Sequence, residues 1–137
     1  MKPLTKKSTN TKIKAEVCYV LLGEFHDGHL RAKMTWRRRG SHSAVQFDWT
    51  KVMEREEKFG DVVGFFHTHP DGFLEPSEQD KSTMRAWTFS FGKPLICAID
   101  TSAGLRAWLF HIEGMAQEFS SIQVETRNRL SGQITIM

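Results

Sequence analysis

The chain has 137 residues, a length that fits one domain and leaves little room for a second. Hydrophobic residues make up 39% and charged residues 26% of it, which favours a globular protein over a disordered one. The net charge of +3 is too small to indicate nucleic-acid binding, and no apolar run approaches the roughly 20 residues of a membrane-spanning helix.

Positive charge gathers at two places. Five lysines lie within the first 14 residues, where no acidic residue stands, and Arg37, Arg38 and Arg39 form a second cluster. We interpret residues 1–12 as a flexible basic tail and the arginines as a charged loop tip. Attraction to an acidic partner surface or to phosphate is the alternative interpretation of both.

The two cysteines, Cys18 and Cys97, both lie inside apolar runs. Such a placement is typical of reduced, buried thiols, and nothing in the sequence requires a disulfide between them. We therefore expect a cytoplasmic protein.

The chain begins with a predicted hairpin. Ile13 to Leu22 is rich in β-branched and aromatic residues and predicts a strand that ends at Gly23. Phe25 to Gly28 closes with Asp-Gly and predicts the turn. His29 to Trp36 predicts the second strand, followed by a loop that runs through Arg39, Gly40 and Ser41.

A helix and a short strand come next. Asp48 can cap a helix over about Trp49 to Lys58, which Gly60 ends. Asp61 to His69 is short and apolar and predicts a strand, which Pro70 ends.

The second half predicts another helix and another hairpin. The helix is opened by Pro76 and Ser77 and runs to about Phe89. The hairpin consists of Pro94 to Asp100 and Gly104 to Ile112. Further strands are predicted at Glu118 to Glu125 and at Gln133 to Met137. This order of elements predicts an α+β fold with a mostly antiparallel sheet and helices packed against it.

Two histidines stand two residues apart on the predicted strand before Pro70. His67 and His69 therefore point to the same face, together with Val63 and Phe65, so that face is expected to look inward. Neutral imidazoles side by side on an apolar face are good ligands for zinc.

A carboxylate follows on the next helix. Ser77, Asp80, Met84 and Trp87 share one helical face, and the apolar members indicate that this face is buried. A buried ionised carboxylate is costly unless it is paired or bound to a metal. We predict that Asp80 joins His67 and His69 as a third zinc ligand. Ser-x-x-Asp alone is also an ordinary capping box, and His-x-His alone is common by chance.

Three protein ligands leave a fourth zinc position open for water, as in catalytic rather than structural sites. A hydrolytic centre also needs a general base. Glu16 is our candidate, because it shares a strand face with Cys18, Val20 and Leu22. Glu24 is the rival, and we expect it in a solvated loop.

These residues resemble the JAMM (MPN-plus) zinc metalloprotease family, whose motif is an upstream Glu, then His-x-His-Pro, then Ser-x-x-Asp. Residues 67–70 read HTHP, and Ser77 and Asp80 follow at the family's spacing. Glu16 to Gly23 (EVCYVLLG) is similar to the family's strand that carries the catalytic Glu, which favours Glu16 over Glu24. The resemblance covers roughly Glu16 to Ile112.

The resemblance implies an MPN (cytidine deaminase-like) fold, a curved β-sheet flanked by helices, for residues 13–137 as a single catalytic domain. It implies that Zn²⁺ is held by His67, His69 and Asp80, that Glu16 moves protons and that Ser77 steadies the oxyanion. The implied reaction is cleavage of the peptide or isopeptide bond after the C-terminal glycine of a ubiquitin-like protein. The short chain is more similar to small prokaryotic members than to eukaryotic deubiquitinases.

Three alternatives stay open. The substrate could be a small sulfur-carrier protein with a blocked C-terminus, which also has an extended Gly-Gly tail. The protein could be a non-catalytic MPN scaffold, although such scaffolds usually lack the metal ligands. A nucleic-acid partner has only the basic clusters in its favour, and no membrane partner is expected.

Overall fold

The computed structural model describes residues 16–40, 47–69, 75–101, 104–112, 116–118 and 122–125. The predicted basic tail over residues 1–12 and the predicted strand from Gln133 to Met137 lie outside these residues. The predicted first strand is described from Glu16 onward.

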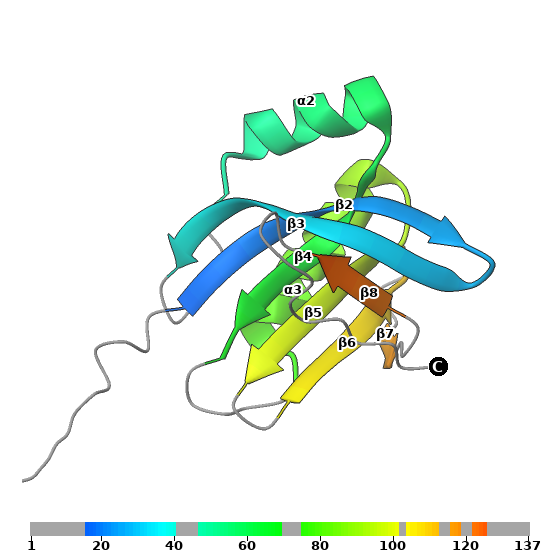
Figure 1. The fold of residues 1–137 in the computed structure, drawn as a ribbon. Coiled ribbons are helices and arrows are strands. Elements are labelled where there is room, and N and C mark those ends of the chain that lie inside the picture. The colour runs from blue at the N-terminus through cyan, green and yellow to red at the C-terminus, as the bar shows by residue number, and fades with distance from the viewer. Residues whose placement is uncertain are drawn as a thin grey trace, which may run out of the picture.

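Seven strands form one sheet in the order β7-β6-β5-β4-β2-β3-β8 (Figure 1). Neighbouring strands run antiparallel except in the pairs β4–β5 and β3–β8. The fold is α+β with a mostly antiparallel sheet, as predicted. The bounds are β2 Glu16–His26, β3 His29–Gly40, α2 Trp49–Phe59, β4 Val62–Thr68, α3 Glu78–Phe91, β5 Leu95–Thr101, β6 Gly104–Phe110, β7 Ala116–Glu118 and β8 Ile122–Glu125.

Both helices begin and end where side-chain chemistry predicts. Asp48 caps α2 by accepting a hydrogen bond from the Lys51 amide at 3.2 Å, and Gly60 ends the helix with φ 65°. Ser77 caps α3, and Gly92 ends it with φ 69°, so this helix continues two residues beyond the predicted Phe89. The predicted helices are therefore confirmed, with a longer second one.

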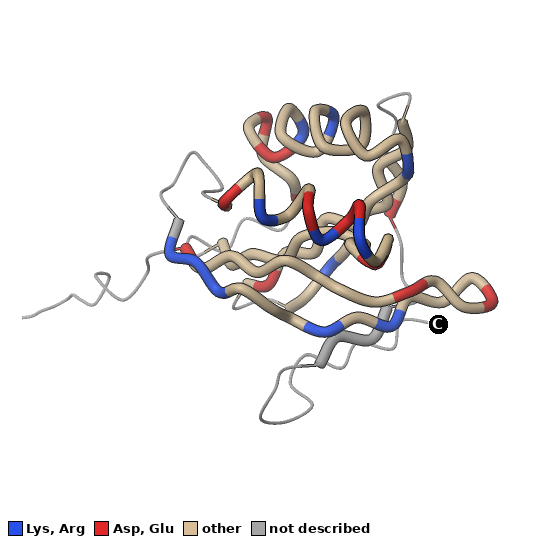
Figure 2. The backbone as a smooth tube through the Cα atoms, turned by 90° about the horizontal axis from the view of Figure 1, so that it is seen from above, with Lys and Arg blue, Asp and Glu red and all other residues tan. Residues whose placement is uncertain are grey.

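The hydrophobic core has one cluster on each face of the sheet. The first cluster contains Val52 of α2 together with Met84 and Trp87 of α3, so both helices pack against the same face (Figures 1 and 2). The second cluster contains Leu21, Ile96 and other strand residues, and none of its members comes from a described helix.

Val63 does not share a face with Phe65, contrary to the sequence prediction. The register of β2 against β4 shifts between Leu21 and Leu22, which face Gly64 and Val62, so Val63 is an extra residue in the ladder. Val63 therefore packs in the second cluster, whereas Phe65 packs in the first, under the helices. The alternation of side chains between the two faces of β4 is interrupted here, because the bulge adds one residue to this strand.

The hairpin strands are longer than predicted. β2 continues through Gly23 and Glu24 to His26, and the turn contains only Asp27 and Gly28, both with positive φ. The placement of Glu24 in a loop was wrong, because this residue pairs with Arg31 in the ladder. It is nevertheless exposed to solvent, as expected.

The arginine cluster also lies on a strand instead of a loop tip. β3 extends to Gly40 and keeps pairing with β2, with Arg38 opposite Cys18 and Arg39 opposite Val17. The ladder has a bulge at Trp36 and Arg37, which lie between the paired residues Thr35 and Arg38, and Trp36 has φ 51° there. Strand pairing satisfies the backbone there while the charged side chains stay in solvent, and Figure 2 shows basic residues along this strand.

The predicted strand from Glu118 to Glu125 is divided in two. β7 pairs with β6 at one edge of the sheet, whereas β8 pairs with β3 at the opposite edge.

Candidate metal centre

The sheet and helix α3 bring four predicted residues to one place. Glu16 is the first residue of β2, His67 lies near the end of β4, and His69 follows that strand directly. Asp80 lies in the first turn of α3. All four side chains are buried, with exposed fractions of 9% or less.

Backbone pairing holds the two histidines on one side of the sheet. Parallel pairing with β5 continues beyond β4, because the amide of His69 donates to the carbonyl oxygen of Asp100 at 3.0 Å. The two imidazole rings lie 4.7 Å apart between centroids at an angle of 83°. The predicted same-face placement of these residues is confirmed.

Asp80 links the helix cap to the histidines. Its amide donates to Ser77 Oγ at 3.0 Å, and its own Oδ2 accepts from the Ser77 amide at 2.8 Å. The same carboxylate lies 3.2 Å from His69 Nε2 through Oδ2 and 3.5 Å from His67 Nε2 through Oδ1. Asp80 therefore takes part in the cap of helix α3 and contacts both imidazoles at the same time.

The protonation states suit a metal. Burial lowers the pKa of His67 to about 4, although the charge of Asp80 opposes this shift, so His67 is neutral at physiological pH. Burial raises the pKa of Asp80, but the hydrogen bonds that its carboxylate accepts from His69 and from the Ser77 amide act in the opposite direction, and the pKa stays below its ordinary value, so the carboxyl is ionised. Neutral imidazole and ionised carboxylate are the forms that bind zinc.

The spacing suits a metal as well. Zinc bonds of about 2.0–2.2 Å to nitrogen and oxygen in a tetrahedral arrangement separate neighbouring ligand atoms by roughly 3.3 Å. The distances from Asp80 to the two imidazole nitrogens, 3.2 Å and 3.5 Å, bracket this value. The Asp80 carboxylate is therefore within reach of a zinc ion at either imidazole, one oxygen toward each, whereas the ligand atoms that lie within 4.8 Å of one another belong to Glu16, His67 and His69.

Glu16 lies next to the histidines. One ligand atom each from Glu16, His67 and His69 lie within 4.8 Å of one another. Thr68 helps to place the start of β2, because its Oγ1 accepts a hydrogen bond from the Val17 amide at 3.0 Å. Glu16 is thus close enough to act as a base beside a metal, or to bind one itself. Glu24 does not belong to this group.

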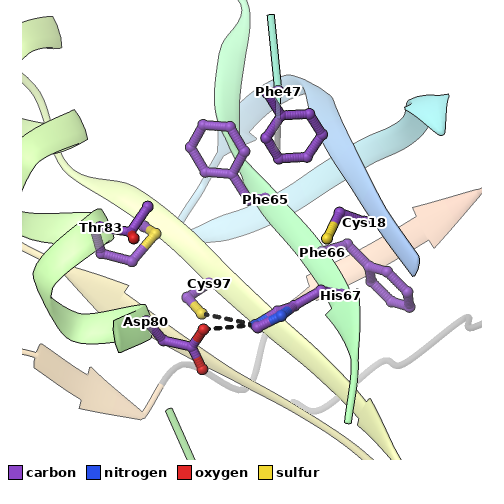
Figure 3. A pocket seen from close by; sticks show the side chains of 9 residues that line it. Cys18, Phe47, Phe65, Phe66, His67, Asp80, Thr83 and Cys97 are labelled. Atoms are coloured by element: carbon purple, nitrogen blue, oxygen red, sulfur yellow. Dashed lines mark hydrogen bonds and ion pairs between the residues drawn. The ribbon is translucent and has the colours of Figure 1, made fainter. Parts of the chain in front are cut away.

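Sequence reasoning missed two thiols beside the centre. Cys18 faces His67 across the β2–β4 ladder, and Cys97 Sγ lies 3.9 Å from His67 Nε2 (Figure 3). Neither cysteine belongs to a metal-binding motif, so only the strand order could have revealed their place. They line a cavity of about 10 Å³ with Phe47, Phe65, Phe66, His67, Asp80, Thr83 and Met84.

The fold and the centre define an α+β protein with a buried group of imidazoles and carboxylates that is suited to a metal ion. The family of prokaryotic homologs of the JAB domain matches this chain over residues 7–111, and the chain belongs to that family. The predicted membership of the JAB/MPN group is thereby confirmed. None of the curated proteins matches the chain. Within the described residues, neither helix is long and apolar enough to cross a membrane.

Proposed function

We propose that this protein is a zinc-dependent peptidase that cleaves the bond after the C-terminal glycine of a ubiquitin-like protein. The observation that carries the proposal is the convergence of the Glu16, His67 and His69 ligand atoms within 4.8 Å, with the Asp80 carboxylate against both imidazoles. His67, His69 and Asp80 would hold zinc. Zinc, when bound, supplies a Lewis acid and lowers the pKa of water.

Glu16 is the proposed proton carrier. It is buried on the side of β2 that faces the helices, as are Cys18 and Val20. From this position its carboxylate accepts a proton from the attacking water and delivers it to the leaving amine.

Ser77 is the proposed oxyanion donor. Its Oγ accepts a hydrogen bond from the Asp80 amide, so the hydroxyl hydrogen points elsewhere. A hydroxyl that is fixed in this way can donate to the oxygen that becomes negative during attack on a carbonyl. Because Ser77 and Asp80 belong to one capping box at the start of α3, the Ser77 hydroxyl and the Asp80 carboxylate keep fixed positions relative to each other.

The substrate tail is expected to bind in an extended form, because two successive glycines offer only main-chain groups for recognition. Beyond Lys33, the outer edge of β3 pairs with no strand among the described residues, and its end lies opposite Glu16. β3 would then lie between the tail and β2, so the tail would run roughly 10 Å, two strand spacings of about 4.8 Å, from the strand that carries Glu16.

The test is cleavage of a ubiquitin-like protein fused through its Gly-Gly tail to a fluorescent protein. A second substrate carries the same tail on a lysine side chain, and a third is a sulfur-carrier protein extended at its C-terminus. We expect cleavage after the glycine, loss of cleavage with a chelator and recovery with added zinc. A zinc-loaded protein that cleaves none of the three would favour the non-catalytic scaffold.

A further inference from the structure

Strand β3 carries five Lys and Arg side chains and no acidic one, and its neighbouring strands compensate only the first two. Arg31 lies opposite Glu24 of β2, and Lys33 lies opposite Glu125 of β8. Opposite charges on paired strands attract each other, so the positive charge in this half of β3 is balanced. The other three residues form the arginine cluster at the end of the strand: Arg37, Arg38 and Arg39.

The arginine cluster faces no carboxylate within the described part of the chain. Arg38 and Arg39 lie opposite Cys18 and Val17, and none of the ion pairs between described residues includes an arginine of the cluster. The nearest acidic residue along β2, Glu16, is buried at the centre. All three arginine side chains are exposed, and Figure 2 shows them as the basic end of β3. Their positive charge is therefore uncompensated and accessible to a partner.

The bulge in β3 puts one of these arginines on the side of the metal centre. Because the bulge adds a residue, Arg38 instead of Arg37 lies opposite Cys18. Directly opposed residues of an antiparallel pair point to the same side of the sheet. Cys18 lines a cavity together with His67 and Asp80, so Arg38 shares the side of the sheet on which the centre lies. Only β2 separates its strand from the histidine strand β4.

Charged side chains at the edge of a sheet often serve only to prevent aggregation of one edge with another. That role explains why the cluster is exposed. It does not explain why β3 has balanced charge at one end and uncompensated charge at the end beside the centre. Among the described residues, the outer edge of β3 is also unpaired from Met34 onward, so a bound segment has access to the cluster from that side.

We propose that the arginine cluster is a docking surface for an acidic stretch of the substrate protein. This inference rests on the peptidase of the proposed function and names a feature of its substrate. Guanidinium groups suit the task, because each can bind a carboxylate through two parallel hydrogen bonds. A segment that passes the end of β3 meets Arg38 on the side of the centre and Arg39 on the other side.

The cluster lies within reach of residues close to the cleaved bond. β3 and β4 are roughly 10 Å apart, a distance that about three residues of an extended chain cover. Acidic residues just before the two glycines can therefore contact the cluster while the cleaved bond lies at the centre. A protein partner is favoured over nucleic acid, because the net charge is only +3 and the uncompensated charge is confined to three residues.

The test compares two fluorescent peptides that end in Gly-Gly, one with Asp and Glu before the glycines and one with Asn and Gln in their place. Fluorescence anisotropy measures their binding to zinc-loaded Glu16→Gln, which should not cleave them. We expect the acidic peptide to bind about 10-fold more tightly, and we expect this preference to weaken as salt rises from about 0.05 M to about 0.5 M.

Two variants in the same background locate the preference. Replacement of all three arginines of the cluster by Gln should abolish it. The matched control, Arg31→Gln with Lys33→Gln, removes exposed basic residues of the same strand that face acids, and it should keep the preference. Equal binding of both peptides, or a preference that the triple variant retains or the control also loses, would overturn the inference.

Further outcomes are also decisive. If the triple variant does not fold or aggregates, Arg38→Glu should lose most of the preference and Arg38→Lys should keep it, whereas an equal preference in both would contradict the inference. Tighter binding of a single-stranded DNA oligonucleotide than of the acidic peptide would assign the cluster to nucleic acid instead. Cleavage without an acidic preference would leave the peptidase and remove the docking surface. A preference that depends on the cluster in a protein without cleavage activity would do the reverse.

Discussion

The carboxylate of Asp80 contacts His69 through the same oxygen, Oδ2, that accepts the capping hydrogen bond from the Ser77 amide. One side chain thus starts helix α3 and completes the group around the histidines. The N-terminus of α3 also favours a negative charge at this position. Its two roles can be separated by substitution, because a cap needs an oxygen acceptor whereas a zinc ligand needs a charge.

Asp80→Asn should lose zinc and keep the helix. The amide oxygen of asparagine can still accept from the Ser77 amide, so we expect the free energy of unfolding of the metal-free protein to change by less than about 1 kcal/mol. Zinc content after dialysis should fall sharply, because a neutral amide is a weaker ligand than a carboxylate. Urea unfolding and elemental analysis measure the two effects.

Ser77→Ala is the converse variant. It should cost about 1 kcal/mol of stability through the lost cap, retain zinc and reduce turnover. If Asp80→Asn retains zinc as firmly as the wild type does, Asp80 is a cap alone and the predicted ligand set is wrong.

Gly64→Ala should disturb the centre from a distance. A Cβ at Gly64 would lie 2.1 Å from the carbonyl oxygen of Ile96, a backbone atom of β5 that cannot easily move. The strand would have to separate from β5, three residues before His67. We expect a loss of about 3 kcal/mol or more in the free energy of unfolding, together with weaker zinc retention.

Gly28→Ala is the control for this substitution. A Cβ at Gly28 meets nothing within 4 Å, and its φ of +74° carries only a conformational cost, about 1 kcal/mol. Zinc binding should be unchanged. Equal stability losses for the two variants would show that the close approach of β4 and β5 is unimportant.

Acid should destabilise the metal-free protein through His67. Burial lowers the pKa of this side chain from its ordinary 6.5 to about 4. Between these values the unfolded chain takes up a proton on His67 and the folded chain does not. Stability therefore falls as the pH falls from 6.5 towards 4, by up to about 1.4 kcal/mol per pH unit.

Urea unfolding of the chelator-treated protein across this pH range measures the slope. His67→Gln should flatten the slope, because glutamine does not titrate. An unchanged slope in this variant would mean that His67 titrates alike in both states.

Local signals in the sequence were sufficient for most of the fold. Asp48 and Ser77 predicted the helix starts, and Asp27 with Gly28 predicted the hairpin turn, because each acts within a few residues of the backbone it satisfies. The bulge at Val63 and the extension of β3 to Gly40 depend on the pairing partner, which no local pattern contains.

The same distinction between local and long-range signals applies to the candidate site. His67 and His69 lie two residues apart at the end of β4, and Ser77 and Asp80 lie within one turn at the start of α3, so their spacing alone predicted how each pair is arranged. Cys97 comes beside them only because β5 pairs in parallel with β4, a long-range contact without a motif.

The most direct test of the account is a comparison of Glu16→Gln with Glu24→Gln in the cleavage and zinc assays. Both glutamates lie on β2, but Glu16 is buried beside the histidines and Glu24 is exposed. We predict that Glu16→Gln retains zinc and loses about 100-fold or more in turnover, while Glu24→Gln matches the wild type. Undiminished turnover in Glu16→Gln, or loss of its zinc, would contradict the assignment of Glu16 as the base.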